Sequence, residues 1–220
     1  QPLAAQAGLK MLLRGGNAVD AALATAITLT LVEPTGCGLG SDAFAIVWDG
    51  ENLHGLNSSG RSPASWSANR FSDNNVMPYR GWESVTVPGV VAGWVSLSEK
   101  FGKLPFQELF EPAIHYAESG FALSPIISQQ WSLGADKLSD QPGFADNFLQ
   151  NGVPPTAGEV YTNIGFSKSL KLIAETKGDA FYNGILAEQI DAFAKKHSAA
   201  LQLSDLAEHR ANWSGTISKD

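Results

Sequence analysis

The sequence predicts an α+β fold in which helices dominate and the sheet is small and antiparallel. Apolar residues recur at helical spacing along most of the chain, whereas residues 43–56 carry the one confident pair of strands. Of the 220 residues, 44% are hydrophobic and 17% are charged, which is the composition of a globular protein. The length suits one large domain or a large part of one.

Two helices are expected at the start of the chain. Residues 2–14 carry an apolar stripe at helical spacing, and Gly15-Gly16 ends that helix because glycine adopts the left-handed cap without steric cost. Asn17 is expected to cap a second helix over residues 18–32, with Asp20 near its positive end. This second helix is apolar on nearly every face, so it is expected to be buried.

A β-hairpin is expected next. A glycine-rich turn over residues 36–42 leads into the apolar segment 43–48, which predicts a buried strand. Asp49-Gly50 is a hairpin signal, so residues 51–56 are expected to return beside the first strand.

The rest of the chain is expected to be mainly helical. Pro88 suits the first position of a helix, and Pro112 predicts a kink in another. Residues 139–162 read as a long surface loop, and residues 212–220 show no terminating element. The expected helices lie at about 88–100, 105–119, 124–137, 164–176, 184–197 and 204–209.

A lone hairpin is not an independently stable sheet, and a buried strand needs partners. One explanation is an α-rich domain with one small sheet. The other is that the hairpin belongs to a sheet completed by chain that is not present here. Gln1 is not an initiator methionine, so an upstream segment is expected to have been lost or cut away.

Composition argues against several classes of partner. The net charge of −7 weighs weakly against nucleic acid and against an anionic membrane surface, so neither is expected as a partner. The longest apolar run, residues 18–32, is shorter than the roughly 20 residues that a membrane span needs, so no membrane span is expected. With one cysteine, Cys37, no intrachain disulfide can form.

Motifs for covalent, metal or nucleotide chemistry are not evident. Cys37 would need a nearby histidine to act as a nucleophile and is expected to be structural. The turn at 36–42 lacks the Gly-Lys-Ser/Thr ending of a phosphate loop and precedes a strand, so nucleotide binding is rejected, whereas a place in a pocket wall stays open. Four histidines fall at no ligand or triad spacing: His54, His115, His197 and His209.

The segment after the hairpin, LNSSGRSPA (56–64), is the candidate binding site. Asn57, Ser58 and Ser59 offer polar donors beside the guanidinium of Arg61, at the end of a core strand where binding residues tend to lie. That combination suits a carboxylate, which arginine binds through two parallel hydrogen bonds. The alternative is an ordinary polar turn with a solvated arginine.

Several segments along essentially the whole chain form one ordered series. They are QPLAAQAGLKMLLRGGNAVDAALA (1–24), GLGSDAFAIVWD (38–49), SGRSPA (59–64), TVPGVVAGW (86–94), FGKLPFQELFEPAIHYAESGFALS (101–124) and FYNGILAEQI (181–190). Read together, they resemble the γ-glutamyltranspeptidase family.

The resemblance implies an N-terminal-nucleophile (Ntn) hydrolase built as an αββα sandwich. Such a proenzyme cuts itself into a large and a small subunit, and the small subunit begins with a threonine that is both nucleophile and, through its α-amine, base. The chain resembles the front portion of the large subunit. Residues 1–220 are therefore expected to form an incomplete single domain, helix-rich, with a small antiparallel sheet completed by missing chain.

The same resemblance sets what this chain is expected to hold. The first strand before Gln1, the later part of the large subunit and the whole small subunit are expected to lie outside it. No catalytic residue, metal ligand or cofactor is therefore expected within the chain. Its expected partners are a γ-glutamyl small-molecule substrate and the small subunit of the same proenzyme.

One departure from the family concerns Arg61. Typical members bind the α-carboxylate of the γ-glutamyl group with an arginine in a run like Asp-Phe-Arg-Glu, and alignment on Pro63-Ala64 puts Ser59 at that place. Arg61 would reach the same pocket if the backbone stays extended through Gly60, because alternate side chains of a strand share a face. The sequence also resembles a branch with Asn-x-Ser-Gly-Arg, where some relatives are acylases of glutaryl-type β-lactam side chains.

The leading expectation is hydrolysis or transfer of γ-glutamyl groups, with glutathione as the natural substrate. Arg61, helped by Asn57, Ser58 and Ser59, would orient the substrate carboxylate. An acylase acting on glutaryl-like amides is the second expectation. A binding or structural protein that has lost its nucleophile is the third.

Overall fold

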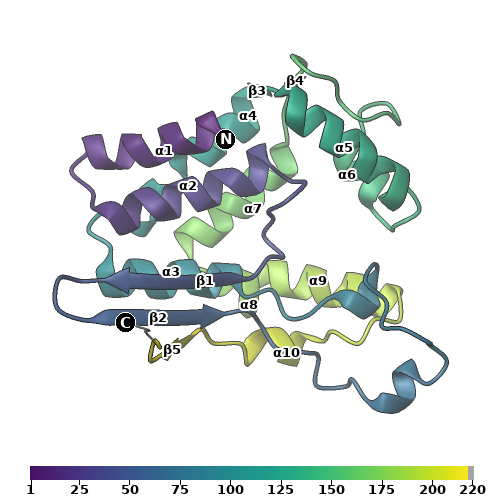
Figure 1. Cartoon of the computed structure of the whole chain (residues 1–220). Helices are drawn as coiled ribbons and strands as arrows, with labels where there is room; N and C mark the ends of the chain where they lie inside the picture. The colour runs from purple at the N-terminus through teal and green to yellow at the C-terminus, as the bar shows by residue number, and fades with distance from the viewer. Residues whose placement is uncertain (218–220) are drawn as a thin grey trace. The chain divides into compact units, whose positions relative to one another are not determined.

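A computed structural model describes residues 1–217 of the chain, which divides into two compact units. The first unit comprises Gln1–Gly38 and Phe101–Ala174, and the second comprises Leu39–Lys100 and Glu175–Asp220. Each unit is therefore assembled from two separate stretches of sequence. The expected α+β fold, rich in helices and with a small antiparallel sheet, is confirmed (Figure 1). The prediction that residues 1–220 form one incomplete domain stays a prediction.

The first unit is built mainly of helices. They are α1 (Pro2–Leu13), α2 (Ala18–Val32), the 3-10 helix η3 (Phe106–Phe110), α4 (Glu111–Ser119), α5 (Pro125–Leu138), α6 (Phe144–Phe148) and α7 (Ile164–Glu175). The helix α2 has the bounds that the sequence predicted, and its interior position is confirmed by buried Leu23, Ile27 and Leu31. The helix α1 packs closely along it, since a side chain at Gly8 would lie 2.8 Å from the carbonyl oxygen of Ala21.

The corner between α1 and α2 is tied to a distant part of the same unit. The side chain of Asn17 accepts hydrogen bonds from the backbone of Val19 and Asp20, each at 3.0 Å, and the Asp20 carboxylate accepts from Asn17 N at 2.8 Å. That carboxylate is fully buried and also accepts from the backbone of Lys103 at 3.1 Å and Leu104 at 3.3 Å. The expected cap of α2 therefore also binds the backbone of Lys103 and Leu104 to the start of this helix.

Two expectations in the first unit need correction. The segment at 105–119 is not one kinked helix, because it changes from the 3-10 helix η3 to α4 at Glu111, next to Pro112. The segment at 139–162 is not entirely loop, since it contains α6 and the strand β4 (Val160–Tyr161), which pairs antiparallel with β3 (Phe121–Ala122). Strands of two residues have no periodicity for a sequence to show.

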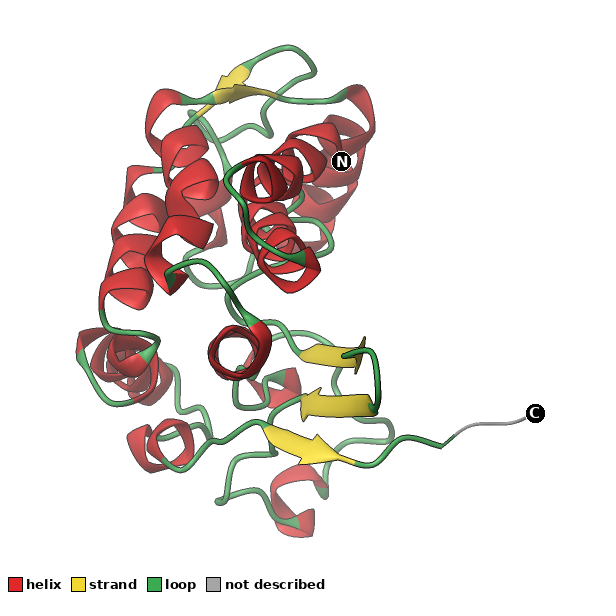
Figure 2. Ribbon diagram, turned by 90° about the vertical axis from the view of Figure 1, so that its left-hand side faces the viewer, coloured by secondary structure: helices red, strands yellow, loops and turns green. Residues whose placement is uncertain are grey.

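The second unit holds a three-stranded antiparallel sheet in the order β1-β2-β5 (Figure 2). Its strands are β1 (Ala43–Trp48), β2 (Leu53–Ser58) and β5 (Asn212–Ser214). Its helices are the 3-10 helices η1 (Ala68–Phe71) and η2 (Trp82–Ser84), and α3 (Val90–Phe101), α8 (Asp179–Tyr182), α9 (Ile185–Lys196) and α10 (Leu203–Ala207).

Three boundaries in the second unit differ from the sequence expectation. The returning strand begins at Leu53, because Asp49 Oδ1 accepts from Glu51 N at 2.8 Å and Asn52 N at 2.7 Å and so extends the turn. The helix α3 begins at Val90, two residues after the predicted proline. The prediction that residues 212–220 lack a terminating element is wrong for 212–214, which form β5; residues 218–220 lie outside the described part.

The two faces of the sheet differ in what covers them within the second unit. On one face Ala43 and Ser58 approach α3, since a side chain at Gly93 would lie 3.1 Å from the Cβ atom of each. On the other face Phe44, Ile46 and Trp48 of β1 are 69%, 71% and 62% exposed. Three large apolar side chains in a row are unusual on a surface that faces only water.

No helix in residues 1–217 combines the length and the hydropathy that crossing a membrane requires.

Candidate functional site

The polar segment after β2 is held against the start of α3. Ser58 is buried, and its hydroxyl donates a hydrogen bond of 2.6 Å to the carbonyl oxygen of Gly89. Asn57 is exposed and accepts a hydrogen bond of 3.0 Å from the backbone N–H of half-buried Ser59. The structure thus turns the side chain of Ser58 inward to α3 and uses that of Asn57 within the segment itself.

Gly60 ends the extended conformation of this segment. Its φ angle is +79°, and a side chain there would have its Cβ atom 1.7 Å from the carbonyl oxygen of Val87. The condition for Arg61 to share a strand face with Ser59 was an extended backbone, and that condition is not met. Glycine is required here because other residues rarely adopt this backbone angle and would also collide with Val87.

Arg61 follows the turn, with its backbone fixed and its side chain exposed. Its carbonyl oxygen accepts a hydrogen bond of 2.9 Å from Val87 N. Its guanidinium has no hydrogen bond or ion pair with any residue in 1–217. The donors of Arg61 are thus available to an external anion.

In the described part of the chain Arg14, Arg70 and Arg210 are hydrogen-bonded or ion-paired, whereas Arg80 has only a ring contact. Arg14 forms an ion pair with Glu111 at 2.6 Å, and Arg70 forms one with Glu83 at 2.6 Å. Arg210 donates to the carbonyl oxygen of Ala207 at 2.7 Å, and Arg80 lies 5.2 Å from the ring centre of its neighbour Tyr79.

A buried histidine that the sequence did not single out lies near this segment. His209 is 5% exposed, and neither of its ring nitrogens has a hydrogen-bond partner in the described part of the chain. Its pKa is lowered, first by burial, which penalises the charged ring, and then by the positive charges of Arg61 and Arg210. His209 is therefore a neutral imidazole beside cationic side chains.

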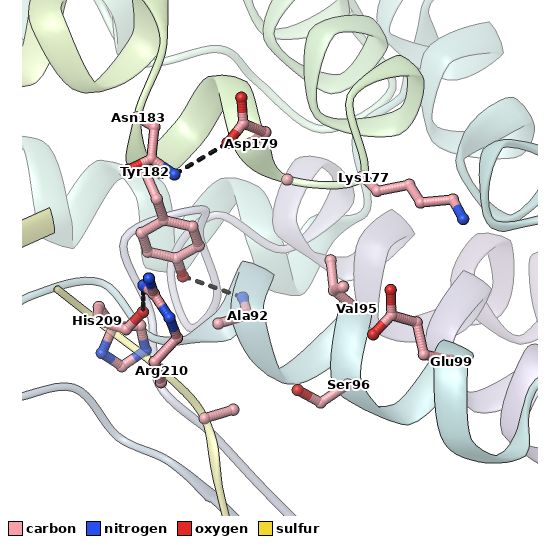
Figure 3. A pocket seen from close by; sticks show the side chains of 12 residues that line it. Ala92, Val95, Ser96, Glu99, Lys177, Asp179, Tyr182, Asn183, His209 and Arg210 are labelled. Carbon is pink, nitrogen blue, oxygen red and sulfur yellow. Dashed lines mark hydrogen bonds between the residues drawn. The ribbon is translucent and has the colours of Figure 1, made fainter. Parts of the chain in front are cut away.

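The ring of His209 packs against the ring of Tyr182, and both residues line a pocket of about 300 Å³ (Figure 3). The two rings are 5.4 Å apart, and Figure 3 shows Arg210 rising beside them. The pocket is open and lined by Ala92, Val95, Ser96, Glu99, Lys177, Gly178, Asp179, Tyr182, Asn183, His209, Arg210 and Ala211. Arg61 is not in its wall, so the pocket and the free guanidinium are separate features.

The lowered pKa of His209 predicts a loss of stability in mild acid. As pH falls below the ordinary value of 6.5, the unfolded chain takes up a proton before the folded chain does. The stabilisation is complete above 6.5 and is lost as pH falls through the lower folded value. The urea midpoint of the full-length protein should therefore fall less between pH 7.5 and 5 in His209→Gln than in the unchanged protein.

His115 provides the control for this measurement because it is exposed. The variant His115→Gln shows the effect of removing a histidine from the surface. If His209→Gln keeps the pH dependence of the unchanged protein, the neutral state of His209 does not contribute to acid sensitivity.

Other side chains that could act as nucleophiles show no activation in the described part of the chain. Cys37 is half-buried, and burial followed by the charge of Glu33 raises the pKa of its thiol, which disfavours the reactive thiolate. The hydroxyls of Thr25 and Thr28 donate to Ala21 O at 2.8 Å and Ala24 O at 2.7 Å within α2. Among residues 1–217, no group of three histidine, cysteine or acidic side chains could hold a metal ion.

Comparison with known proteins places the chain in a family. The sequence model of the family described as Gamma-glutamyltranspeptidase matches residues 4–220. The chain is 34% identical to a protein of Bacillus subtilis (strain 168) named glutathione hydrolase-like YwrD proenzyme, over 99% of this chain and 42% of that protein. It is 33% identical to the acylase ACY 1 proenzyme of Pseudomonas sp. (strain SE83), over 95% of this chain and 40% of that protein.

The fold of this chain is also similar to that of a solved structure. The crystal structure of cephalosporin acylase from Bacillus halodurans matches with a TM-score of 0.95 and 44% identity, covering 100% of this chain and 43% of that one. The chain belongs to the γ-glutamyltranspeptidase family, as the sequence resemblance indicated. It spans about two fifths of the length of the curated relatives it matches.

Proposed function

We propose that the whole protein cleaves amides whose acyl group ends in a carboxylate, and that Arg61 binds this carboxylate. The leading substrate class is γ-glutamyl amides of the glutathione type. The observation that carries the proposal is the free guanidinium of Arg61, fixed at its backbone by Val87 and without an acidic partner in residues 1–217. Asn57, Ser58 and Ser59 support the turn that presents it.

The proposed reaction proceeds through an ester intermediate. The hydroxyl of a threonine outside this chain attacks the amide carbonyl, and the α-amine of that threonine takes the hydroxyl proton. The proton passes to the departing amine, and the acyl group stays on the threonine. Water then gives hydrolysis, or an amino acid gives transfer. This chain would contribute the binding and orientation of the acyl group.

An acylase for glutaryl-like amides is the second candidate. It is favoured by the 44% identity to a structure named cephalosporin acylase, against 34% to the glutathione hydrolase-like protein. Glutaryl and γ-glutamyl groups share the carboxylate, so Arg61 serves either one. They differ in the α-amino group, which Arg61 cannot recognise because it has only donors.

The proposed partner of this chain is the small subunit of the same proenzyme. Support comes from the exposed face of β1, where Phe44, Ile46 and Trp48 need an apolar cover. Further support comes from the two curated relatives, both of which are named proenzymes.

Two measurements on the full-length gene product test the proposal. Intact-mass analysis should show a second chain that begins with threonine. Turnover of γ-glutamyl and glutaryl 4-nitroanilides should then favour the γ-glutamyl compound, whereas preference for the glutaryl compound would select the acylase. A full-length product that stays uncut and turns over neither compound would instead identify a non-catalytic protein.

A further inference from the structure

The helix α3 begins without a capping side chain of its own. The residue before it is Gly89, whereas the N–H groups in the first turn of a helix need acceptors from outside the helix. A serine or threonine cannot replace Gly89, because its Cβ atom would lie 1.9 Å from the carbonyl oxygen of Ser58. Because β2 approaches Gly89 so closely, a capping serine or threonine is excluded at this position.

Two acceptors from other elements take the place of this cap. The carbonyl oxygen of Ser41 accepts from Val90 N at 2.9 Å. The hydroxyl of Tyr182, on α8, accepts from Ala92 N at 3.0 Å and donates to the carbonyl oxygen of Pro88 at 2.8 Å. One phenol thus joins the start of α3 to the residue before Gly89. Figure 3 shows its hydrogen bond with Ala92.

The segment that Tyr182 holds is the one that holds Arg61. Val87, next to Pro88, donates its N–H to the carbonyl oxygen of Arg61, and its own carbonyl oxygen faces Gly60. Residues 87–92 are therefore bonded to the arginine turn on one side and to Tyr182 on the other. A shift of Pro88 would move Val87 and, with it, the base of the Arg61 side chain.

The side chain of Tyr182 is held in place by burial and by contacts with two neighbouring rings. It is 7% exposed, and its ring lies 5.1 Å from Phe181, edge to face, and 5.4 Å from His209. Burial raises the pKa of its hydroxyl, so the proton that it donates to Pro88 is retained at neutral pH.

We propose that Tyr182 is a positioning residue for substrate carboxylate binding, acting through Pro88 and Val87 on Arg61. It does not touch the substrate. The inference rests on the proposed function, because it assumes that Arg61 binds the carboxylate. It goes beyond that function by assigning substrate selectivity to a hydroxyl 121 positions later in the chain, at residue 182 against residue 61.

The test is Tyr182→Phe in the full-length processed protein, which removes the hydroxyl and keeps the ring. KM for the preferred carboxylate-bearing anilide should rise about 5- to 10-fold, the effect of losing hydrogen bonds worth roughly 1 kcal/mol or slightly more. The kcat should stay within about twofold, and kcat/KM for valeryl 4-nitroanilide, which has no carboxylate, should not change.

Tyr161→Phe is the matched control. Tyr161 is also buried, and its hydroxyl also makes two hydrogen bonds, at 3.1 Å to Asn147 O and 3.3 Å from Asn163 Nδ2, but it belongs to the first unit. Both variants should lose thermal stability, and only Tyr182→Phe should change KM. An equal change in both, or an unchanged KM in Tyr182→Phe, would overturn the inference.

A double variant separates this inference from the proposed function. If Tyr182 acts through Arg61, Tyr182→Phe should have no further effect on KM in an Arg61→Ala background. A full additional effect in that background would refute the positioning role and leave the role of Arg61 intact. If Arg61→Ala alone leaves KM unchanged, carboxylate binding by Arg61 fails first, and the role assigned to Tyr182 fails with it.

Discussion

Replacing Arg61 by alanine in the full-length protein should raise KM for its carboxylate-bearing anilide by about 30- to 900-fold. This corresponds to roughly 2–4 kcal/mol, the loss expected when a charged, hydrogen-bonded pair loses one partner. The reason is that no other described side chain is bonded to this guanidinium, so the substrate carboxylate would be its main partner. Initial-rate kinetics on the processed protein would measure the change.

Two further variants sharpen this expectation. Arg61→Lys keeps the charge but cannot form two parallel hydrogen bonds, so its KM should lie between those of Arg61→Ala and the unchanged protein. Arg80→Ala removes another exposed arginine of the second unit and should leave KM unchanged. An unchanged KM in Arg61→Ala would mean that Arg61 is an ordinary solvated side chain.

Gly60→Ala should be strongly destabilising, with a loss of roughly 3–5 kcal/mol. Part of the loss, about 1–2 kcal/mol, comes from placing alanine at a φ angle of +79°. The remainder comes from moving the backbone of Val87, whose carbonyl oxygen would lie 1.7 Å from the new methyl group. Urea unfolding of the full-length protein would measure the difference.

Gly152 provides the control, because it separates the two contributions. Its φ angle of +81° is nearly the same, but nothing lies within 4 Å of where its Cβ atom would be. Gly152→Ala should therefore cost only the backbone contribution. If Gly60→Ala proves no more destabilising than Gly152→Ala, the close contact between the arginine turn and Val87 is not rigid.

Local signals in the sequence were sufficient for some elements. The helix α2 was predicted with its observed bounds, because Asn17 caps one end and Glu33-Pro34 breaks the other. The bounds of β1 were also predicted, from an unbroken apolar run before Asp49-Gly50. The prediction that this strand is buried is wrong, because Phe44, Ile46 and Trp48 on one face are exposed. The strand β5 was missed because Asn212, Trp213 and Ser214 carry no strand pattern and pair with β2 only through the tertiary fold.

Only part of the candidate site could be predicted from the sequence. Arg61 could be singled out because its neighbours in sequence are polar and follow a strand. Tyr182 and His209 could not, because their importance depends on Pro88, Ala92 and each other, which tertiary packing brings together. The backbone angle of Gly60 was equally hidden, since glycine permits both extended and left-handed conformations.

The interleaving of the two units bears on how the chain folds during synthesis. Residues 1–38 leave the ribosome before residues 101–174, yet two of the elements that α2 packs against, η3 and α4, begin only at Phe106. At a synthesis rate of roughly 5–20 residues per second, several seconds pass between the synthesis of the apolar α2 and that of η3 and α4. Neither unit can be released intact by cutting the chain once, because each is interrupted by a stretch of the other. Residues 39–100 separate the two stretches of the first unit, and residues 101–174 separate those of the second.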